Sequence, residues 1–543
     1  MNAGDSGAPW WRGAVIYQVY PRSYKDTNGD GVGDLRGIRD QMAHIASLGV
    51  DAVWLAPFFR SPMADMGYDV SDYCDVDPIF GTLEDFDLLV AEAHRLGLKV
   101  MIDQVLSHSS DRHPWFQESR RDRTNPRADW YVWADAKPDG TPPNNWLAIF
   151  GGPSWEWESG RRQYYMHNFL ASQPDLNFHN EEVRAALMET MRFWLDRGVD
   201  GFRLDTVNYY FHDSQLRDNP PYIGATNDIP DTNPYGYQDH IFDKSQPENI
   251  GFLKALRALL DSYPERTSVG EVGDGARSLA TVAAYTEGGD KLHVCYTFDL
   301  LGPVFSAAHV AACVRDFESI ASGGWICWAM SNHDVPRHVS RFTRPGDDPN
   351  RVAAFALSLL ACLRGSICLY QGEELGLTEA DLAFEDLRDP YGIRFWPGFK
   401  GRDGCRTPMV WTGDESSGGF THGRPWLPVP PEHLAMAVDR QEADPASTLN
   451  HYRAVLAWRR RQQVLVAGDV RLLSEADDVL AFVRSSGDDK LLCIFNFNAE
   501  GRRFEVEPSL GEATALDFPG ARARVTGAGI DLEPLGVFVG RLA

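Results

Sequence analysis

The sequence predicts an α/β protein, a (β/α)8 TIM barrel with an inserted irregular domain after strand 3 and a C-terminal antiparallel β-domain. Three observations favour this fold class. Short apolar runs alternate with helical patterns along most of the 543 residues, as in parallel α/β architectures. The alternation stops over residues 104–178. After about residue 465, the helical patterns give way to short apolar runs separated by turn residues.

The first part of the barrel is predicted within residues 1–103. Its strands are short runs rich in β-branched, aromatic and aliphatic residues, at Val15 to Tyr20, Val53 to Leu55 and Val100 to Ile102. One helical pattern runs through residues 38–48, and another spans residues 84–96 with its apolar side chains on one face.

The stretch 104–178 is rich in Trp, Asn, Pro and Gly, and its length within a repeat indicates an inserted domain rather than a loop. The second part of the barrel is expected over residues 179–464, with an irregular insertion at 384–430. Its strands are the run into Asp205 and residues 268–271, 293–297, 326–330 and 366–370. Its helices fit residues 181–197, 251–262, 305–321, 350–363 and 448–463. Eight strands result, followed by a C-terminal β-domain at 465–543 with strands at 479–483, 491–495 and 537–539.

Charge and cysteine usage narrow the class of protein. The net charge is -25, from 77 Asp+Glu against 52 Lys+Arg, so no basic excess exists to neutralise the phosphates of a nucleic acid. No run of about 18 apolar residues predicts a membrane span, and the start of the chain, Met1 to Asp5, lacks the apolar core of a signal peptide. The 8 cysteines form no CxxC pair, which favours reduced core thiols. We expect a cytoplasmic monomer or homodimer.

Acidic residues end several of the predicted strands. Asp103 ends strand three, Asp205 strand four and Glu271 strand five, and Asn332-His333-Asp334 ends strand seven. In this fold the active site is built from the C-terminal ends of different strands. Buried carboxylates without partners cost several kcal/mol, so a purely structural reason for all four is hard to find. The joint pattern predicts an active site based on carboxylates.

Two of these acids suit glycoside cleavage, in which one carboxylate is a nucleophile and a second is an acid/base. Arg203 and Asp205 lie two residues apart, so on a strand they point the same way. We expect the arginine to lower the pKa of Asp205 and keep it ionised. Glu271 has no basic neighbour in sequence and could keep a raised pKa, as a proton donor needs. Taken singly, the alternatives are a buried ion pair for Arg203 and Asp205, a rim salt bridge for Glu271 and a surface turn for His333-Asp334.

Several motifs then resemble a known family. Residues 103–108, 201–205, 269–271 and 332–334 are similar to the four ordered sequence regions of the α-amylase family of glycoside hydrolases, and 173–177 resemble its fifth region. The stretch from Trp10 through residues 26–37, and residues 401–409, resemble its α-glucosidase and oligo-1,6-glucosidase branch. The resemblance runs from about Trp10 through the C-terminal domain.

The resemblance implies roles for individual residues. Asp205 would be the nucleophile that forms a β-glucosyl ester, Glu271 the acid/base, and Asp334 the group that binds ring hydroxyls and favours an oxocarbenium-like state. Arg203, His108 and His333 would complete the subsite for the non-reducing glucose.

The rest of the sugar pocket follows from the same resemblance. Tyr68 would stack under the ring, and Asp65 would pair with Arg402 across a blind end, so that only a chain terminus enters. Arg406 competes with Arg402 for that pairing. Ser107 stands where the family commonly has Asn. Candidates for the pocket wall, with core packing as an equal alternative, are Phe150, Phe169 and Phe298.

A candidate metal loop follows the first strand. Asp26, Asn28, Asp30 and Asp34 alternate with glycines, and Val32 could add its carbonyl, which is a pattern typical of a structural Ca2+ (or Mg2+) site. An EF-hand is not expected, because its twelfth position would be glycine and no helix precedes the loop. The alternative is an Asp/Gly turn without metal.

The residue after the proposed nucleophile bears on linkage. In this branch Val at that position accompanies α-1,6 cleavage, and small or hydroxylated residues accompany α-1,4 cleavage; here it is Thr206. We therefore expect a retaining, exo-acting α-glucosidase that takes short oligosaccharides such as maltose, with transglucosylation as a side activity.

Other members of the same family remain as alternatives. They are an oligo-1,6-glucosidase and a glucosyltransferase or isomerase such as trehalose or sucrose isomerase. Non-catalytic heavy chains of amino-acid transporters are disfavoured because they lack the carboxylates and carry a membrane span. An α-amylase that acts within long chains is disfavoured by the blind end.

Overall fold

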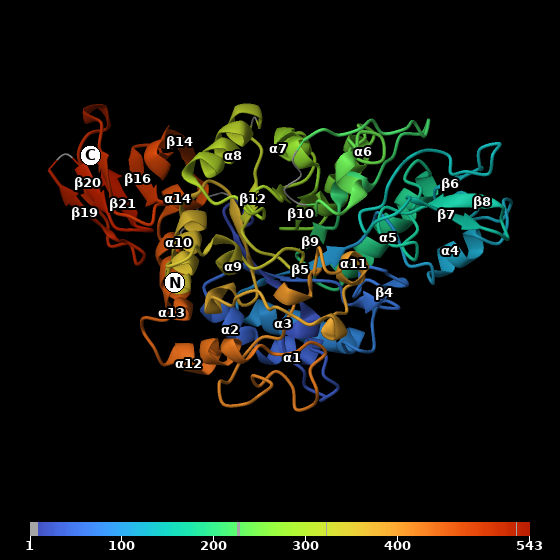
Figure 1. Ribbon diagram of the computed structural model, residues 1–543, viewed down its shortest axis with the longest axis horizontal. Helices are drawn as coiled ribbons and strands as arrows, with labels where there is room; N and C mark the ends of the chain where they lie inside the picture. The colour runs from blue at the N-terminus through green and yellow to red at the C-terminus, as the bar shows by residue number, and fades with distance from the viewer. Residues whose placement is uncertain (1–8, 225–228, 322, 528) are drawn as a thin grey trace.

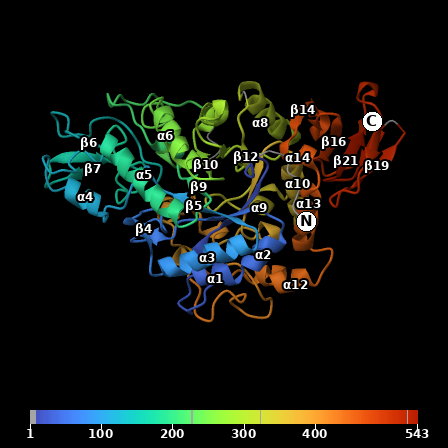
Figure 2. The same ribbon diagram turned by 180° about the vertical axis from the view of Figure 1, so that it is seen from behind.

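The computed structural model describes residues 9–224, 229–321, 323–527 and 529–543. The N-terminal stretch Met1 to Asp5, considered above for a signal peptide, lies outside these residues. A central barrel carries the inserted domain at one end and the C-terminal β-domain at the other, and both views show this arrangement (Figures 1 and 2).

Eight parallel strands form the barrel. The sheet order is β11-β10-β9-β5-β2-β1-β13-β12, and a parallel bridge between Cys295 and Ile326 joins its two ends. Consecutive barrel strands along the chain are therefore neighbours throughout. The barrel strands are β1 (Val15–Val19), β2 (Ala52–Leu55), β5 (Lys99–Gln104), β9 (Gly201–Leu204), β10 (Thr267–Val272), β11 (Val294–Thr297), β12 (Cys327–Ala329) and β13 (Ser366–Tyr370). The predicted fold class is confirmed.

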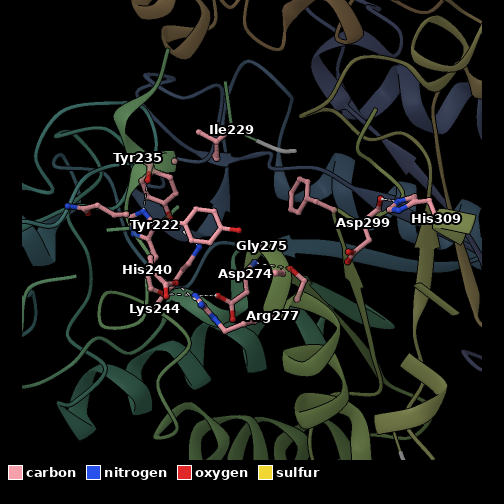
Figure 3. Close-up of a pocket in the computed structure, with 16 residues that line it drawn as sticks. Tyr222, Ile229, Tyr235, His240, Lys244, Asp274, Gly275, Arg277, Asp299 and His309 are labelled. Carbon is pink, nitrogen blue, oxygen red and sulfur yellow. Dashed lines mark hydrogen bonds and ion pairs between the residues drawn. The ribbon is translucent and has the colours of Figure 1, made fainter. Parts of the chain in front are cut away.

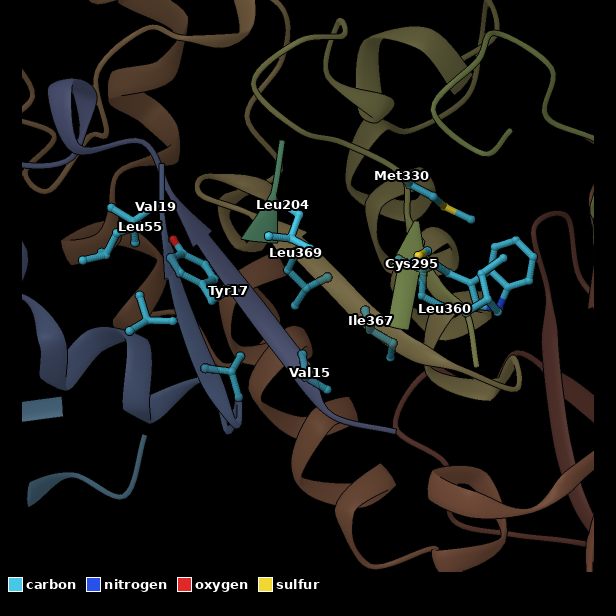
Figure 4. Packing of buried hydrophobic residues seen from close by; sticks show 14 of the residues in the cluster. Val15, Tyr17, Val19, Leu55, Leu204, Cys295, Met330, Leu360, Ile367 and Leu369 are labelled. Atoms are coloured by element: carbon cyan, nitrogen blue, oxygen red, sulfur yellow. The ribbon is translucent and has the colours of Figure 1, made fainter. Parts of the chain in front are cut away.

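Each barrel strand is buried on both faces, which explains its apolar sequence. Ile16 of β1 belongs to a cluster inside the barrel with Trp54 and Met101 of the next two strands. Its neighbours Val15 and Tyr17 point the other way and join the large core between strands and helices, part of which Figure 4 shows. The period of two thus separates a barrel lumen from the core that holds the helices in place.

Helices cover the outside of the barrel, and several of them begin at side-chain caps. Thr82 forms a capping box at the start of α3, and Asn180 and Ser306 cap α5 and α8. The α-helices outside the inserted domain are α1 (Leu35–Asp40), α2 (Met42–Ser47), α3 (Leu83–Arg95), α5 (Glu181–Asp196), α6 (Asn249–Asp261), α7 (Ser278–Thr286), α8 (Ala307–Ile320), α9 (His338–Phe342), α10 (Pro349–Cys362), α11 (Pro390–Phe395), α12 (Val438–Glu442), α13 (Thr448–Arg460) and α14 (Gln463–Ala467).

The helix predictions differ from the structure in two ways. The single helix expected over 38–48 is two helices, because Gln41 between α1 and α2 leaves helical geometry, with ψ of 8°. The shorter helices α9, α11, α12 and α14 were not predicted, and neither was α7. Its sequence is apolar nearly all round, so it lacks the one-sided pattern by which a surface helix is recognised.

The two added domains contain antiparallel sheets. The inserted domain is more regular than expected, with helix α4 (Pro114–Ser119) and a sheet in the order β6 (Trp133–Ala134), β8 (Gln163–Met166), β7 (Trp155–Glu158). A short hairpin, β3 (Phe59–Arg60) and β4 (Asp72–Val76), leads from β2 to α3. The C-terminal strands are β14 (Asp469–Ser474), β15 (Val479–Ser486), β16 (Asp489–Asn496), β17 (Arg502–Glu505), β18 (Ala513–Ala515), β19 (Ala523–Thr526), β20 (Gly529–Leu532) and β21 (Val537–Leu542). They form a five-stranded and a three-stranded sheet.

Two further observations concern the chain's setting. Within the described residues, no helix combines the length and the apolar character needed to cross a membrane. All 8 cysteines are free thiols, and only Cys74 is not buried.

Candidate active site

Three neighbouring strands and the loop after a fourth strand bring the predicted acids together. Asp103 and Glu271 are the penultimate residues of β5 and β10, Asp205 follows the last residue of β9, and Asp334 lies in the loop after β12. Asp103, Asp205 and Glu271 are buried. Parallel pairing of β5, β9 and β10 aligns their carboxyl ends, so the acids share one end of the barrel.

Arg203 is the centre of this group. Its Nη1 lies 2.7 Å from Asp103 Oδ1 and 2.6 Å from Asp205 Oδ1, and its Nη2 lies 2.5 Å from Glu271 Oε1. The arginine side chain is 1% exposed. One buried guanidinium therefore holds three carboxylates. One of them follows its own strand, β9, and the other two come from the strands on either side, β5 and β10.

The pKa values correct one expectation. Burial raises the pKa of Asp205 to about 7, against the lowering effect of Arg203, so the predicted depression is wrong. Burial likewise raises the pKa of Glu271 and of Asp103 to about 7, again opposed by Arg203. One cation cannot neutralise three buried carboxylates, so the group shares a proton near neutral pH and titrates as a unit.

Asp334 behaves in the opposite way. Burial opposes its ionisation, but His333, Arg402 and Arg406 outweigh burial and hold the pKa of Asp334 well below its usual range. Because burial lowers the pKa of His333 to about 3, the two arginines carry this effect at neutral pH. Arg402 Nη1 lies 3.2 Å and Arg406 Nη2 3.0 Å from Asp334 Oδ1. Asp334 is thus a stable carboxylate beside a group that shares a proton.

Glu271 is positioned by two further donors. The Tyr296 hydroxyl donates to Glu271 Oε1 at 2.7 Å and accepts from Arg203 Nη2 at 2.9 Å. The backbone N–H of Thr206 donates to Glu271 Oε2 at 3.0 Å. Thr206 has φ of 41°, in the left-handed region, which costs free energy for a β-branched residue and aims its N–H at the acid. The Thr206 hydroxyl lies 3.0 Å from Ser107 Oγ, the residue that replaces the usual Asn.

Tyr68, His333 and His108 form one network beside the acids. The rings of Tyr68 and His333 stack at an interplanar angle of 7°, and the Tyr68 hydroxyl hydrogen-bonds to His333 Nε2. His108 Nε2 lies 3.0 Å from the Tyr68 carbonyl and 3.1 Å from Gln173 Nε2. Burial lowers the pKa of His108 to about 4, so both imidazoles are neutral at pH 7.

The predicted blind-end pair is formed. Arg402 Nη2 lies 2.8 Å from Asp65 Oδ1 and 2.9 Å from Asp389 Oδ1, and its guanidinium packs over the Phe150 ring at 4.8 Å. Burial raises the pKa of Asp65 to about 6, against the lowering effect of Arg402. Arg402 therefore joins the loop after β2, Asp389 of the second insertion, and Asp334.

A single cavity contains most of the predicted residues. Arg203 and His333 do not line it; they lie behind the wall and act on it through Asp205, Glu271 and Tyr68. The predicted residues that line it are Asp65, Tyr68, His108, Phe150, Phe169, Asp205, Glu271, Phe298, Asp334 and Arg402.

A second cavity adjoins the first. The two share Ile229, Tyr235, Lys244 and Phe298. In Figure 3, Asp299 and His309 lie on the opposite side of this pocket from Tyr235 and Lys244. The buried Lys244 Nζ donates to the hydroxyls of Tyr209 and Tyr235, at 3.0 and 3.2 Å, and to the Gly273 carbonyl at 2.9 Å. Lys244 thereby ties the loop that follows Glu271 to the segment after β9.

The candidate metal loop lies between β1 and α1. Asp26, Asn28 and Asp30 each accept a hydrogen bond from the backbone N–H two residues further on, at 2.8–2.9 Å, and Asp34 caps α1. The loop offers the oxygen donors that Ca2+ prefers. Within the described residues, however, no three carboxylate, imidazole or thiol groups converge on one point. The carboxylates of the loop are turned to its own amides, and the ion stays a prediction.

Several site residues were not predicted. Tyr296 pairs in register with Glu271 across β10 and β11, so strand alternation could have identified it as facing the lumen. Asp389 and Lys244 lie in irregular segments where no periodicity indicates a direction. Glu271 has no basic neighbour in sequence, but in the structure Arg203 reaches it from the adjacent strand; its pKa is nevertheless raised, as predicted.

Comparisons with known proteins agree with this geometry. The family model of the α-amylase catalytic domain matches residues 18–468. A probable α-glucosidase of Rhizobium meliloti (strain 1021) is 56% identical over 538 residues, which cover 98% of this chain and 97% of the relative. An oligo-1,6-glucosidase of Parageobacillus thermoglucosidasius is 35% identical over 529 residues, which cover 92% of each chain.

Solved structures of related enzymes superpose on this chain over nearly its whole length. The crystal structure of an α-glucosyl transfer enzyme, XgtA, superposes with a TM-score of 0.96 at 54% identity, over 99% of this chain and 100% of that one. The trehalulose synthase MutB from Pseudomonas mesoacidophila MX-45 gives 0.88 at 32% identity, over 99% and 100% of the two chains. The sequence regions, the barrel with its acids and these matches together show that the chain belongs to the α-amylase family of glycoside hydrolases.

Proposed function

We propose that this chain is a retaining, exo-acting α-glucosidase that releases glucose from the non-reducing end of short α-glucosides. The observation that carries the proposal is the placement of Asp205 and Glu271 on the two Nη atoms of one buried arginine, inside a cavity that Asp65 and Arg402 close. The similarity to α-glucosidases and oligo-1,6-glucosidases supports it.

The first step joins the sugar to the protein. Asp205 as a carboxylate attacks the anomeric carbon, the bond to the leaving oxygen breaks, and Glu271 gives that oxygen its proton. The proton shared by the buried acids suits this division of roles, because one carboxylate is ionised while the other donates. In the second step Glu271 takes a proton from water, which attacks the glucosyl ester and frees Asp205. Retention of configuration follows, with carboxyls expected roughly 5–5.5 Å apart.

The remaining residues suit a single terminal glucose. Asp334, a stable carboxylate, would bind ring hydroxyls and favour the distorted sugar. Tyr68 would stack against the ring. The ion pair of Asp65 with Arg402 would exclude a further sugar on that side, so a mid-chain segment cannot enter.

Transfer to acceptors other than water is part of the proposal. The second cavity adjoins the first at Tyr235, Lys244 and Phe298, beside the loop that follows Glu271, and offers space for a leaving group or an acceptor. The solved relative at 54% identity is an α-glucosyl transfer enzyme, which supports a glucosyltransferase as the second candidate function.

We infer an α-1,4 preference from Thr206. Its hydroxyl lies 3.3 Å from Asp205 Oδ2 and 3.0 Å from Ser107 Oγ, so a polar group borders the space in which the leaving sugar would sit. Maltose is accordingly the proposed model substrate.

We further propose that the loop at Asp26, Asn28, Asp30, Val32 and Asp34 holds a structural Ca2+ once its carboxylates turn from their amides to the ion. We place the protein in the cytoplasm, as the free thiols suggest. Its state as a monomer or homodimer stays a prediction.

A substrate panel with purified protein tests the function. We expect hydrolysis of maltose above isomaltose, initial release of α-glucose by NMR, and loss of turnover by at least about 10³-fold in Asp205→Asn. Asp316→Asn, on the exposed face of α8, is the matched control and should retain activity. Faster turnover of isomaltose, release of β-glucose, or conversion of sucrose into an isomer as the main reaction would each overturn the assignment.

A further inference from the structure

A cavity outside the active site is lined by three arginines. They are Arg22, in the turn after β1, and Arg388 and Arg424, from the second insertion; Trp426 and the carboxylate of Asp386 complete the polar and aromatic part of the lining. No residue of this cavity lines the catalytic cavity. It lies close to the outside of the blind end, since Arg388 precedes Asp389, the partner of Arg402.

Arg22 is a buried cation with unsatisfied side-chain donors. It is 7% exposed, and its Nε and Nη2 are buried without a hydrogen-bond acceptor among the described residues. Its guanidinium packs over the rings of Phe80 at 5.7 Å and Trp426 at 5.1 Å. Burial lowers the pKa of Arg22, and Tyr20, Asp77 and Asp69, which raise it, do not outweigh burial. Arg484, which is also buried, shows the contrast, because its Nη1 donates to two carbonyls at 2.8 Å.

The other two arginines also lack a carboxylate. Arg388 Nη1 donates to the carbonyls of Glu385 and Leu387. Arg388 and Arg424 are both exposed, and neither forms an ion pair with any described residue. The chain has 77 acidic against 52 basic residues, so unpaired arginines are not the result of a shortage of acids. Three cations therefore face one cavity that contains a single carboxylate.

We propose that this cavity is a binding site for a phosphate group. A guanidinium presents several N–H donors in a plane and matches the oxygens of a phosphate in geometry and charge. A dianion would neutralise the excess of two positive charges left by three arginines and Asp386. Trp426 beside Arg22 shields that guanidinium from water and strengthens its attraction for an anion.

Inorganic phosphate is the probe that tests the site. Calorimetric titration at constant ionic strength, with chloride replaced by phosphate, should give saturable binding of one equivalent. The double variant Arg388→Gln/Arg424→Gln should bind at least tenfold more weakly and still hydrolyse maltose at the wild-type rate. Arg121→Gln, which removes an exposed arginine of the inserted domain, is the matched control and should bind as the wild type does.

Competition separates this site from the active site. Maltose at a saturating concentration should leave phosphate binding by the Asp205→Asn protein unchanged. If phosphate and maltose shared a site, maltose would weaken phosphate binding. Arg22→Met should abolish phosphate binding if this variant folds. If it does not fold, the double variant Arg388→Gln/Arg424→Gln, which changes two exposed residues, tests the site instead. Absence of saturable binding, or equal binding by the wild type and the double variant, overturns the proposal.

Discussion

Replacing Tyr296 by Phe tests how the acid/base is controlled. The change removes the hydroxyl that donates to Glu271 Oε1 at 2.7 Å and leaves the buried ring in place. That hydrogen bond favours the carboxylate form of Glu271, because an ionised oxygen is the better acceptor. Loss of this hydrogen bond should raise the pKa of Glu271 beyond its value of about 7.

The size of the shift follows from the contact. A hydrogen bond to a charged group contributes about 1.5–3 kcal/mol, and one pKa unit corresponds to about 1.4 kcal/mol. Arg203 Nη2 remains 2.5 Å from the same oxygen and still stabilises the carboxylate, so the low end applies. We expect an upward shift of about one unit.

The assay is the pH dependence of kcat/KM for maltose. Its alkaline limb reports loss of the proton from the acid of the free protein, so it should move to higher pH by about one unit in Tyr296→Phe. Tyr285→Phe is the matched control, because that buried tyrosine bonds to Asn249 at 2.9 Å, away from the acids. An unmoved or lowered alkaline limb in Tyr296→Phe would refute the assignment of this hydroxyl to the ionised form of Glu271.

Two other predictions concern linkage and metal. Thr206→Val keeps the branched shape but removes the hydroxyl near Ser107, and we expect the isomaltose-to-maltose ratio of kcat/KM to rise about tenfold; an unchanged ratio would show that this residue does not set linkage. Chelation with EDTA should lower the Tm, with Ca2+ restoring it, because an ion at a hundredfold excess over its Kd stabilises the folded state by about 2.7 kcal/mol. Asp30→Asn should reduce that response, and an equal Tm with EDTA and with Ca2+ would argue against the metal.

The fold and the positions of the acids could be predicted because they depend on local periodicity. Strand alternation places Arg203 beside Asp205, and parallel pairing brings the ends of neighbouring strands to one rim. These relations hold wherever the strands form, so the positions of Asp103 and Glu271 at the same rim could be predicted as well. The blind-end pair of Asp65 with Arg402 came from a family resemblance and could not have been derived from spacing.

What could not be predicted depends on contacts between distant segments. The pKa of Asp205 rises because burial outweighs one cation that two other acids also share, and sequence shows neither the burial nor the sharing. Asp389 reaches Arg402 through an irregular loop whose path is set by packing. The split at Gln41 between α1 and α2 likewise has no periodic signal.

The end of the cavity that Asp65 and Arg402 close comes from different parts of the chain than the acids do. The acids belong to barrel strands, whereas Arg402 and Asp389 belong to a long connection that could change in length or sequence without moving a strand. If the proposed function holds, bond cleavage and chain-length selectivity are thus separable traits of this architecture. A rearranged connection could turn the terminal slot into a through-going groove while the chemistry stayed as it was, so evolution or an engineer can vary the reach of such a protein with little risk to its reaction.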